Sequence, residues 1–289
     1  MKIALFGNEY HREMMADIEH LVDQLLSHSI EVQVEPSYLD FLQTHHASFC
    51  ARVKRFEDPH SDMVALSIGG DGTFLRTAKV VAAHHIPIMG INAGHLGYLT
   101  TAHINQSQLV VDALLSGNYR IEPRSMLQVQ RLDDDTAFPY ALNEVALLRQ
   151  DTSSMIEVDV LIDGTPLTTY KGDGLLVCTP TGSTAYNLSV GGPVLEPLSR
   201  CMVLSPISPH ALTMRPVVIR DDASLTITTN SRTALYQVSI DGESLVLPSG
   251  TALTITRAPH QAQVMLLKDY NFASTLRTKL MWGKGNREE

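Results

Sequence analysis

One glycine-rich stretch combines a carboxylate with a backbone suited to phosphate binding. Residues 67–73 read Ser-Ile-Gly-Gly-Asp-Gly-Thr and lie between an apolar run and a helical pattern. Glycines let a phosphate approach the backbone, and the start of a helix offers free N–H groups and a positive dipole end. The amides of Gly70, Gly72 and Thr73 are therefore predicted to donate to a phosphate. A carboxylate repels phosphates, so Asp71 is expected to handle a metal ion or to accept a hydroxyl proton.

The same stretch also allows simpler interpretations. Asp71 could cap the helix of a tight strand-to-helix turn. Arg76, one turn into that helix, either reaches a phosphate or is an ordinary solvated helix arginine. The chain has neither a GxxxxGKS/T P-loop nor a GxGxxG fingerprint. A phosphate site here would therefore be of another kind.

A second stretch has the composition of a ligand-binding loop. Residues 179–193 read Thr-Pro-Thr-Gly-Ser-Thr-Ala-Tyr-Asn-Leu-Ser-Val-Gly-Gly-Pro and follow the apolar run Leu175–Val177. The hydroxyl groups can donate hydrogen bonds to a sugar or a base, while the glycines keep the backbone close to the ligand. The ring of Tyr186 is suited to stacking on a base. A Ser/Thr/Gly loop without function is common, but it is rarely so dense in glycine.

The elements that must position these stretches differ between the two parts of the chain. In the first third, strand-type runs alternate with helical patterns, which predicts a parallel sheet with helices on its faces. The predicted strands are 3–6, 31–34, 63–68 and 86–91, and the predicted helices are 14–26 and 73–83.

From about residue 120 to 268 the chain shows many short strand-type runs, including 157–162, 225–228 and 253–256, with turn signals such as Asp163-Gly164 and Asp241-Gly242. This spacing predicts an all-β domain, most simply a sandwich. The fold class is therefore α/β followed by a β-sandwich. A helix over 105–116 is expected to bridge the two, and a helix over 272–282 closes the chain. We expect an α/β domain over 1–118, completed by 269–289, and a dinucleotide-binding sandwich over 119–268.

Composition limits the function classes. The chain has 289 residues, of which 44% are hydrophobic, and a formal net charge of −9. This negative net charge argues against a protein that binds nucleic acid or an anionic membrane through its overall charge. No apolar run reaches the length that crosses a bilayer. Three scattered cysteines fit reduced thiols and a cytoplasmic location, and the twelve histidines show no zinc-ligand spacing, so no protein metal site is expected.

Several of these segments occur in the order and spacing seen in NAD kinases, and the chain resembles that family over nearly its whole length. The Gly-Gly-Asp-Gly-Thr turn is shared with phosphofructokinases and diacylglycerol-type lipid kinases, so the stretch 179–193 is the more specific signal. The segments that resemble the family are Gly69–Thr73, Gly90–Leu99, Asn143–Glu144, Thr179–Pro193, Asp241–Gly242 and Leu276–Trp282.

The resemblance implies transfer of the terminal phosphoryl group of ATP, or of polyphosphate in some members, to the 2′-hydroxyl of the adenosine ribose of NAD. Asp71 would accept the hydroxyl proton, and Mg²⁺ or another divalent cation would bridge the phosphate oxygens. It also implies a homodimer or homotetramer with site residues supplied across the interface, and a final helix that packs on the first domain. The nucleotide-binding residues expected beyond the first turn are Asn143, Glu144, Lys171, Asp173, Thr181, Thr184, Ala185, Tyr186, Asn187, Leu188 and Ser189.

Two positions depart from the family pattern. Lys171 stands where relatives often have arginine, so positive charge is kept but bidentate geometry is lost. Glu243 stands where glutamine is frequent. Both changes bear on the choice between NAD and NADH and on feedback by NADP, and His210 lies in a loop of undecided role. Two alternatives remain: a lipid kinase of the diacylglycerol type, and a non-catalytic NAD-binding module.

Overall fold

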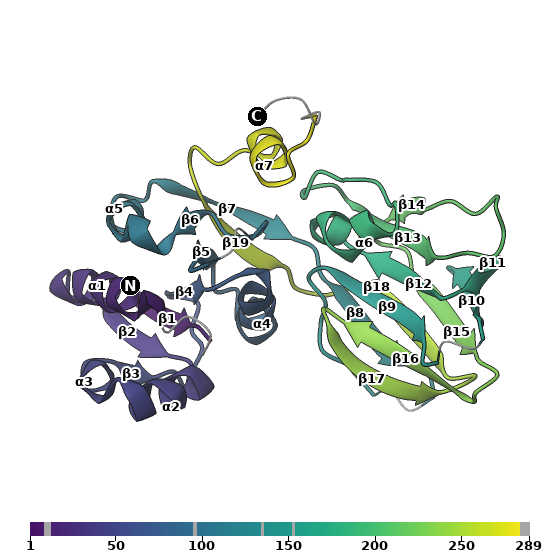
Figure 1. The fold of residues 1–289 in the computed structure, drawn as a ribbon, viewed down its shortest axis with the longest axis horizontal. Coiled ribbons are helices and arrows are strands. Elements are labelled where there is room, and N and C mark those ends of the chain that lie inside the picture. Colours follow the sequence, from purple (N-terminus) through teal and green to yellow (C-terminus); the bar gives the residue numbers. More distant parts are fainter. Residues whose placement is uncertain (9–12, 95–96, 134–135, 152–153, 284–289) are drawn as a thin grey trace. The chain divides into compact units, whose positions relative to one another are not determined.

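The computed structural model describes residues 1–8, 13–94, 97–133, 136–151 and 154–283. The chain divides into two compact units, one formed by Met1–Pro123 with Ala262–Glu289 and the other by Arg124–Gln261 (Figure 1). Within the described ranges, none of the helices has the length and apolar character needed to cross a bilayer.

The first unit is built on one eight-stranded sheet in the order β3-β2-β1-β4-β5-β19-β7, with β6 paired to β5. The pairs β1–β2, β1–β4 and β4–β5 are parallel, as predicted from the alternation of strands and helices, and β5 also pairs in parallel with β19. The strands are β1 (Lys2–Phe6), β2 (Glu31–Val34), β3 (Lys54–Arg55), β4 (Met63–Ile68), β5 (Ile88–Asn92), β6 (Ala102–His103), β7 (Tyr119–Arg124) and β19 (Ala262–Leu267).

Helices pack on this sheet through regularly spaced apolar side chains. In α1 the buried residues Ile18, Leu21 and Leu25 recur at helical spacing, and every residue of β4 is buried. A parallel strand covered by helices on both faces needs such a continuous apolar run. The helices of this unit are α1 (Met15–Ser27), α2 (Pro36–His45), α3 (Ala47–Cys50), α4 (Asp71–Val81), α5 (Ser107–Ser116) and α7 (Phe272–Lys279), with 3-10 turns η2 (Ala82–His84) and η3 (Ile104–Gln106).

Three expectations about this region need correction. Strands β7 and β19 were expected in the sandwich, but both pair within the sheet of the first unit. Helix α5 does not bridge two domains, because it packs on α1, where Gln24 Nε2 donates to Gln108 Oε1 at 2.6 Å. The closing helix ends at Lys279 rather than at residue 282, because Met281 adopts a left-handed φ of 51°.

The second unit is a β-sandwich of two antiparallel sheets. One sheet has the order β11-β10-β15-β18-β8 and the other β14-β13-β12-β9-β16-β17. Burial alternates along β15 and β18, and side chains from both sheets, such as Leu127 and Val145, share one apolar core. The strands are β8 (Leu127–Arg131), β9 (Glu144–Arg149), β10 (Ile156–Ile162), β11 (Thr165–Gly172), β12 (Gly174–Cys178), β13 (Cys201–Ile207), β14 (Val217–Arg220), β15 (Leu225–Asn230), β16 (Leu235–Ile240), β17 (Glu243–Pro248) and β18 (Ala252–Arg257).

The stretch that follows β12 is not an extended loop. It forms a 3-10 turn, η4 (Thr181–Thr184), and one short helical turn, α6 (Tyr186–Ser189). Its hydroxyl and amide side chains favour such compact turns because they bond to the nearby backbone.

Candidate active site

Asp71 is held by a loop of the first unit and does not cap its helix. It is the first residue of α4, directly after the buried strand β4, and Gly70 at the N-cap makes no side-chain bond. The Oδ2 atom accepts the N–H of Tyr98 at 2.8 Å, and Oδ1 accepts the N–H of Leu99 at 2.9 Å. A carboxylate has about four acceptor positions, so each oxygen keeps capacity for another proton donor. The capping alternative for Asp71 is therefore wrong.

The glycines around Asp71 fall into two groups. A Cβ on Gly97 would lie 2.4 Å from Asp71 Oδ1, so this glycine is required for the loop to approach the carboxylate. A Cβ on Gly70 or Gly72 would meet no described atom within 4 Å, and neither residue has a left-handed φ. Packing and backbone strain thus give no reason for glycine at these two positions, whereas close approach of a phosphate does.

Thr73 and Arg76 extend the turn along α4. Thr73 is buried, and its Oγ1 accepts from Asn8 Nδ2 at 2.9 Å and from Arg76 Nη2 at 3.4 Å. Arg76 is exposed, so its guanidinium keeps donors that face outward. Asn8 follows β1, which pairs with β4, so the carboxyl ends of neighbouring parallel strands bring it beside the turn. Of the segment 90–99, His95 and Leu96 lie outside the described residues.

In the second unit, Asp241 holds the Asn143-Glu144 pair. Its Oδ1 accepts the N–H groups of Asn143 at 2.9 Å and Glu144 at 3.0 Å, and its Oδ2 accepts that of Leu142 at 2.7 Å. Asp241 has a φ of 48° and precedes Gly242 in the turn between β16 and β17. The turn chemistry of an Asp-Gly pair thus also places a carboxylate next to the start of β9.

Glu144 is a half-buried carboxyl with unusual electrostatics. Burial, together with the charge of Asp241, raises its pKa to about 7. The backbone N–H that Tyr186 donates to the carboxylate acts in the opposite direction and lowers the pKa. The Oε2 atom of Glu144 is buried and has no hydrogen-bond partner among the described protein atoms, and the same holds for Asn143 Oδ1 and Thr181 Oγ1. Unpaired buried acceptors of this kind are costly, and they cluster in the two segments predicted to bind a dinucleotide.

The segment from Thr181 to Ser189 has an inward and an outward side. Asn187 is fully buried, and its amide donates to the carbonyls of Ser183 and Pro193 while its Oδ1 accepts from Ser205. A Cβ on Gly182 would lie 2.2 Å from the Asn143 carbonyl oxygen, so this glycine lets the turn approach Asn143. Thr184 and Ala185 are half-buried, and Tyr186, Leu188 and Ser189 are exposed.

Lys171 and Asp173 do not lie with these residues. Asp173 Oδ1 pairs with Arg149 Nε at 3.0 Å, and Lys171 Nζ pairs with Glu157 Oε1 at 2.7 Å. In the β9–β12 ladder Glu144 lies opposite Cys178, and Gly174 lies opposite Leu148. At roughly 3.3 Å per residue, the two ends of this ladder are about 13 Å apart. The N–H of His210 donates to the Lys171 carbonyl, and Glu243 is exposed at the start of β17.

Residues 3–119 match the family model described as the ATP-NAD kinase N-terminal domain, and residues 142–267 match the ATP-NAD kinase C-terminal domain. The chain belongs to the NAD kinase family. NAD kinase of Porphyromonas gingivalis is 40% identical over 289 residues, which cover 99% of each chain. NAD kinase of Bacteroides fragilis is 41% identical over 291 residues, which cover 99% of this chain and all of the relative.

Solved structures of NAD kinases have the same fold. Yeast NADH kinase in complex with NADH superposes with a TM-score of 0.83 at 21% identity, over 99% of this chain and 89% of the yeast chain. An NAD kinase from Archaeoglobus fulgidus in complex with ATP superposes with a TM-score of 0.72 at 25% identity, over 96% and 99% of the two chains. The predicted fold, an α/β domain followed by a sandwich with a returning helix, is confirmed.

Four residues that help to build the site had no role assigned from the sequence. Asn8 contacts Thr73, and Asp241 holds Asn143 and Glu144. Gly97 lets its loop approach Asp71, and Lys279 donates to that loop. Only Asp241 carried a signal, the Asp-Gly turn, and that signal concerned the turn rather than the carboxylate. The other three depend on contacts between residues distant in the chain.

Proposed function

We propose that this chain transfers the terminal phosphoryl group of ATP to the 2′-hydroxyl of the adenosine ribose of NAD, with Asp71 as the proton acceptor. The observation on which this proposal depends is the Asp71 carboxylate, held by two loop amides beside glycines that packing does not require. Membership of the NAD kinase family supports the substrates, and the geometry supports the role of the carboxylate.

The first unit would supply the proton acceptor and the phosphate donors. A ribose hydroxyl is a poor nucleophile, and phosphoryl transfer depends mainly on positioning and on charge stabilisation. Asp71 keeps acceptor capacity on both oxygens and can take the hydroxyl proton as the bond to phosphorus forms. The amides of Gly70 and Gly72 at the start of α4 would donate to phosphate oxygens, and the exposed Arg76 would add positive charge. The predicted donor Thr73 differs from them, because its N–H donates to the Gly70 carbonyl at 3.1 Å and so holds the turn.

The second unit would supply the dinucleotide contacts. The buried acceptors of Asn143, Glu144 and Thr181 would receive hydrogen bonds from ribose hydroxyls or from the adenine amino group. The exposed ring of Tyr186 is available to stack on a base. Thr184, Ala185, Leu188 and Ser189 would line the same contact, and Asn187 would hold the segment from within.

The divalent cation would be carried by the nucleotide. Among the described residues, no group of three His, Cys, Asp or Glu side chains could hold a metal ion. This fits Mg²⁺, which commonly keeps several waters and binds substrate phosphates rather than a protein cage. When bound, the cation would neutralise charge on the phosphate oxygens, and its removal by a chelator should stop transfer.

Lys171 and Asp173 support assembly into a homodimer or homotetramer. They lie beyond the end of the β9–β12 ladder opposite to Asn143 and Glu144, and the two ends of that ladder are about 13 Å apart at the usual rise per residue. We propose that they complete the site of a neighbouring subunit. Mixing Asp71→Asn subunits with Asp173→Ala subunits should then restore part of the activity that each variant lacks. A chain that is monomeric by light scattering would contradict this.

The test of the proposed activity is direct. Purified protein with ATP, Mg²⁺ and NAD should form NADP, detected by a dehydrogenase that accepts only NADP. Calorimetric binding of NAD without turnover would favour a non-catalytic module, and phosphorylation of a diacylglycerol but not of NAD would favour a lipid kinase. Parallel reactions with polyphosphate and with NADH would define the donor and the acceptor.

Three free cysteines support a cytoplasmic location, which fractionation of cells that produce the chain would test.

A further inference from the structure

The loop that holds Asp71 is itself held from its other side. The N–H groups of Tyr98 and Leu99 point to the Asp71 carboxylate. The carbonyl groups of Gly97, Tyr98 and Thr100 accept from the ammonium group of Lys279, with Nζ–O distances of 2.7 Å to Gly97 and 3.2 Å to Tyr98. Residues 97–100 therefore lie between an anion and a cation, and the dipoles of the Gly97–Tyr98 and Tyr98–Leu99 peptides are aligned with both charges.

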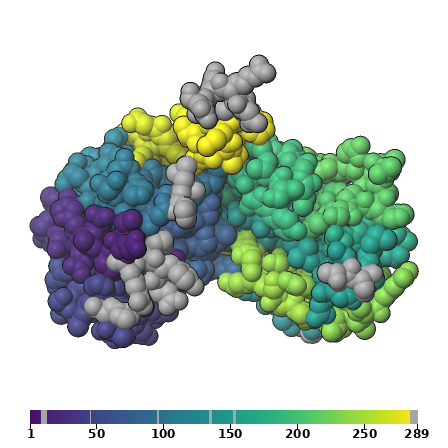
Figure 2. Space-filling view, viewed as in Figure 1, coloured from purple at the N-terminus to yellow at the C-terminus, as the bar shows by residue number. Residues whose placement is uncertain are grey.

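Helix α7 presents Lys279 to this loop. The helix begins with Asn271, whose side chain accepts the N–H of Ser274 at 2.8 Å, and ends at Lys279. Thr275, four residues before Lys279, is buried, so both residues lie on the inward face of the helix. In Figure 2 the yellow C-terminal residues lie against blue and teal residues of the first unit. A cation in the last turn of a helix is also favoured by the helix dipole.

Backbone carbonyl groups take the place of the hydration shell around the Lys279 ammonium group. Its three N–H donors match three carbonyl acceptors, which is the full capacity of an ammonium group. Burial lowers the pKa of Lys279 to about 8, and the charge of Asp71 on α4 acts in the opposite direction. Lysine at this position is therefore coupled to the carboxylate electrostatically as well as through the loop.

We propose that Lys279 is a positioning residue for phosphoryl transfer: it fixes residues 97–100 and thereby the orientation of the Asp71 carboxylate. This inference rests on the proposed function, in which Asp71 accepts the hydroxyl proton. It assigns the returning helix a part in the reaction itself and not only in the packing of the first unit.

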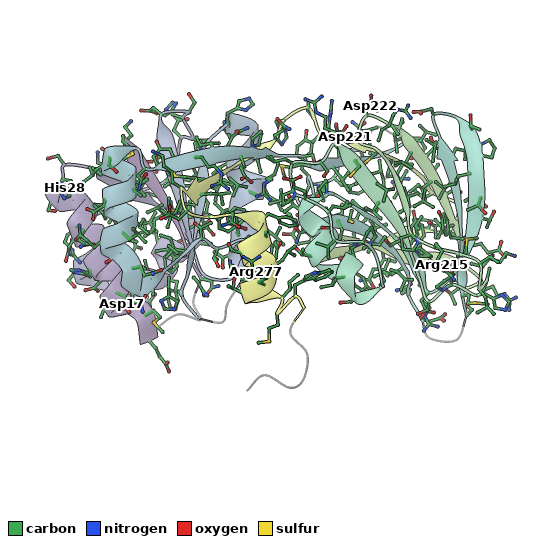
Figure 3. All side chains as sticks on the ribbon, turned by 90° about the horizontal axis from the view of Figure 1, so that it is seen from above. Asp17, His28, Arg215, Asp221, Asp222 and Arg277 are labelled. Atoms are coloured by element: carbon green, nitrogen blue, oxygen red, sulfur yellow. The ribbon has the colours of Figure 1, made fainter. Side chains whose placement is uncertain are left out.

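The experiment compares Lys279→Met and Lys279→Arg with Arg277→Met. Arg277, labelled in Figure 3, lies in the same helical turn and is exposed, so its variant removes one positive charge from α7 and leaves Lys279 in place. Lys279→Met should lower kcat at least ten-fold and change KM for ATP and NAD less than two-fold. Lys279→Arg should recover much of the loss and extend activity to higher pH, because arginine does not lose its proton there. Arg277→Met should behave as the unchanged protein.

Amide hydrogen exchange separates this proposal from the proposed function. Lys279→Met should speed exchange at Tyr98 and Leu99 at least ten-fold, even if the unchanged protein proved inactive on NAD. If Lys279→Met does not fold, Lys279→Gln takes its place in both measurements. An unchanged kcat, or unchanged exchange at both amides in a folded variant, would overturn the role of Lys279. Failure of the unchanged protein to phosphorylate NAD, with faster exchange in the variant, would overturn only the proposed activity.

Discussion

In each unit a carboxylate accepts hydrogen bonds from consecutive backbone N–H groups of a segment distant in the chain. Asp71 accepts from Tyr98 and Leu99, and Asp241 accepts from Leu142, Asn143 and Glu144. The two differ in what lies next to them. Asp71 is coupled to the ammonium of Lys279, whereas burial and the charge of Asp241 together raise the pKa of the Glu144 carboxyl.

The two carboxylates therefore differ in role: one is oriented for a reaction partner, and the other fixes the backbone of a neighbouring segment. With only two N–H partners, the Asp71 carboxylate keeps spare acceptor positions, which suits a group that takes a proton. Asp241 uses three acceptor positions on the backbone, and its charge adds to the effect of burial in raising the pKa of its neighbour Glu144. Under the proposed function, similar hydrogen bonding therefore serves chemistry in one unit and architecture in the other.

The largest expected effect comes from removing the Asp71 charge. Asp71→Asn should lower kcat by about 10²- to 10⁴-fold, the usual contribution of a positioned general base, while NAD binding stays within a few-fold. Steady-state kinetics and calorimetry with NAD measure the two quantities. Turnover close to that of the unchanged protein would remove Asp71 from the role of proton acceptor.

In Asp241→Ala we expect the main effect on stability, whereas in Asp71→Asn we expect it on turnover. It leaves three backbone N–H groups without their carboxylate, so we expect the free energy of unfolding to fall by about 2 to 4 kcal/mol. Urea unfolding followed by circular dichroism measures the change. The comparison fails if Asp241→Ala abolishes turnover at normal stability, because Asp241 would then act in the chemistry.

Glu144→Gln tests the electrostatic part of the comparison. The pKa of Glu144 is about 7 in the folded chain, above its ordinary value of 4.5, so its favourable contribution is complete below pH 4.5 and is lost as pH rises through 7. Without nucleotide, the Gln variant should match the unchanged protein at acidic pH and exceed its stability on the order of 2 kcal/mol at pH 8. Equal pH profiles of unfolding would show that Glu144 is not perturbed.

The smallest expected effect separates the two groups of glycines. Gly72→Ala lies in α4 with open space around the new Cβ, so stability should rise by about 0.5 to 1 kcal/mol while activity falls, because the methyl group faces the proposed phosphate position. Gly97→Ala is the matched contrast: its Cβ would meet Asp71 Oδ1, so stability and activity should fall together. Thermal unfolding beside kinetic assays distinguishes them, and full activity in Gly72→Ala would argue against a phosphate at that turn.

The sequence by itself determined the class of the fold, several of its strands and the family. Periodicity predicted β1, β2 and β4 almost to the residue, since a buried parallel strand requires a continuous apolar run and an exposed one alternates. The turn residues Asp163-Gly164 and Asp241-Gly242 both adopt the left-handed φ values that this pair favours. These features are local, and local patterns in the sequence encode them. The roles of individual site residues remain predictions.

Only the tertiary structure decided which sheet receives a strand and which segments face each other. In the sequence, the strand-type runs of β7 and β19 resemble those of the sandwich strands. Their place in the first sheet follows from pairing with distant strands. The hydrogen bonds from Lys279 to residues 97–100, and from residues 142–144 to Asp241, join positions more than 90 residues apart. No periodicity or turn signal encodes such contacts, because they arise when separate elements pack into one core.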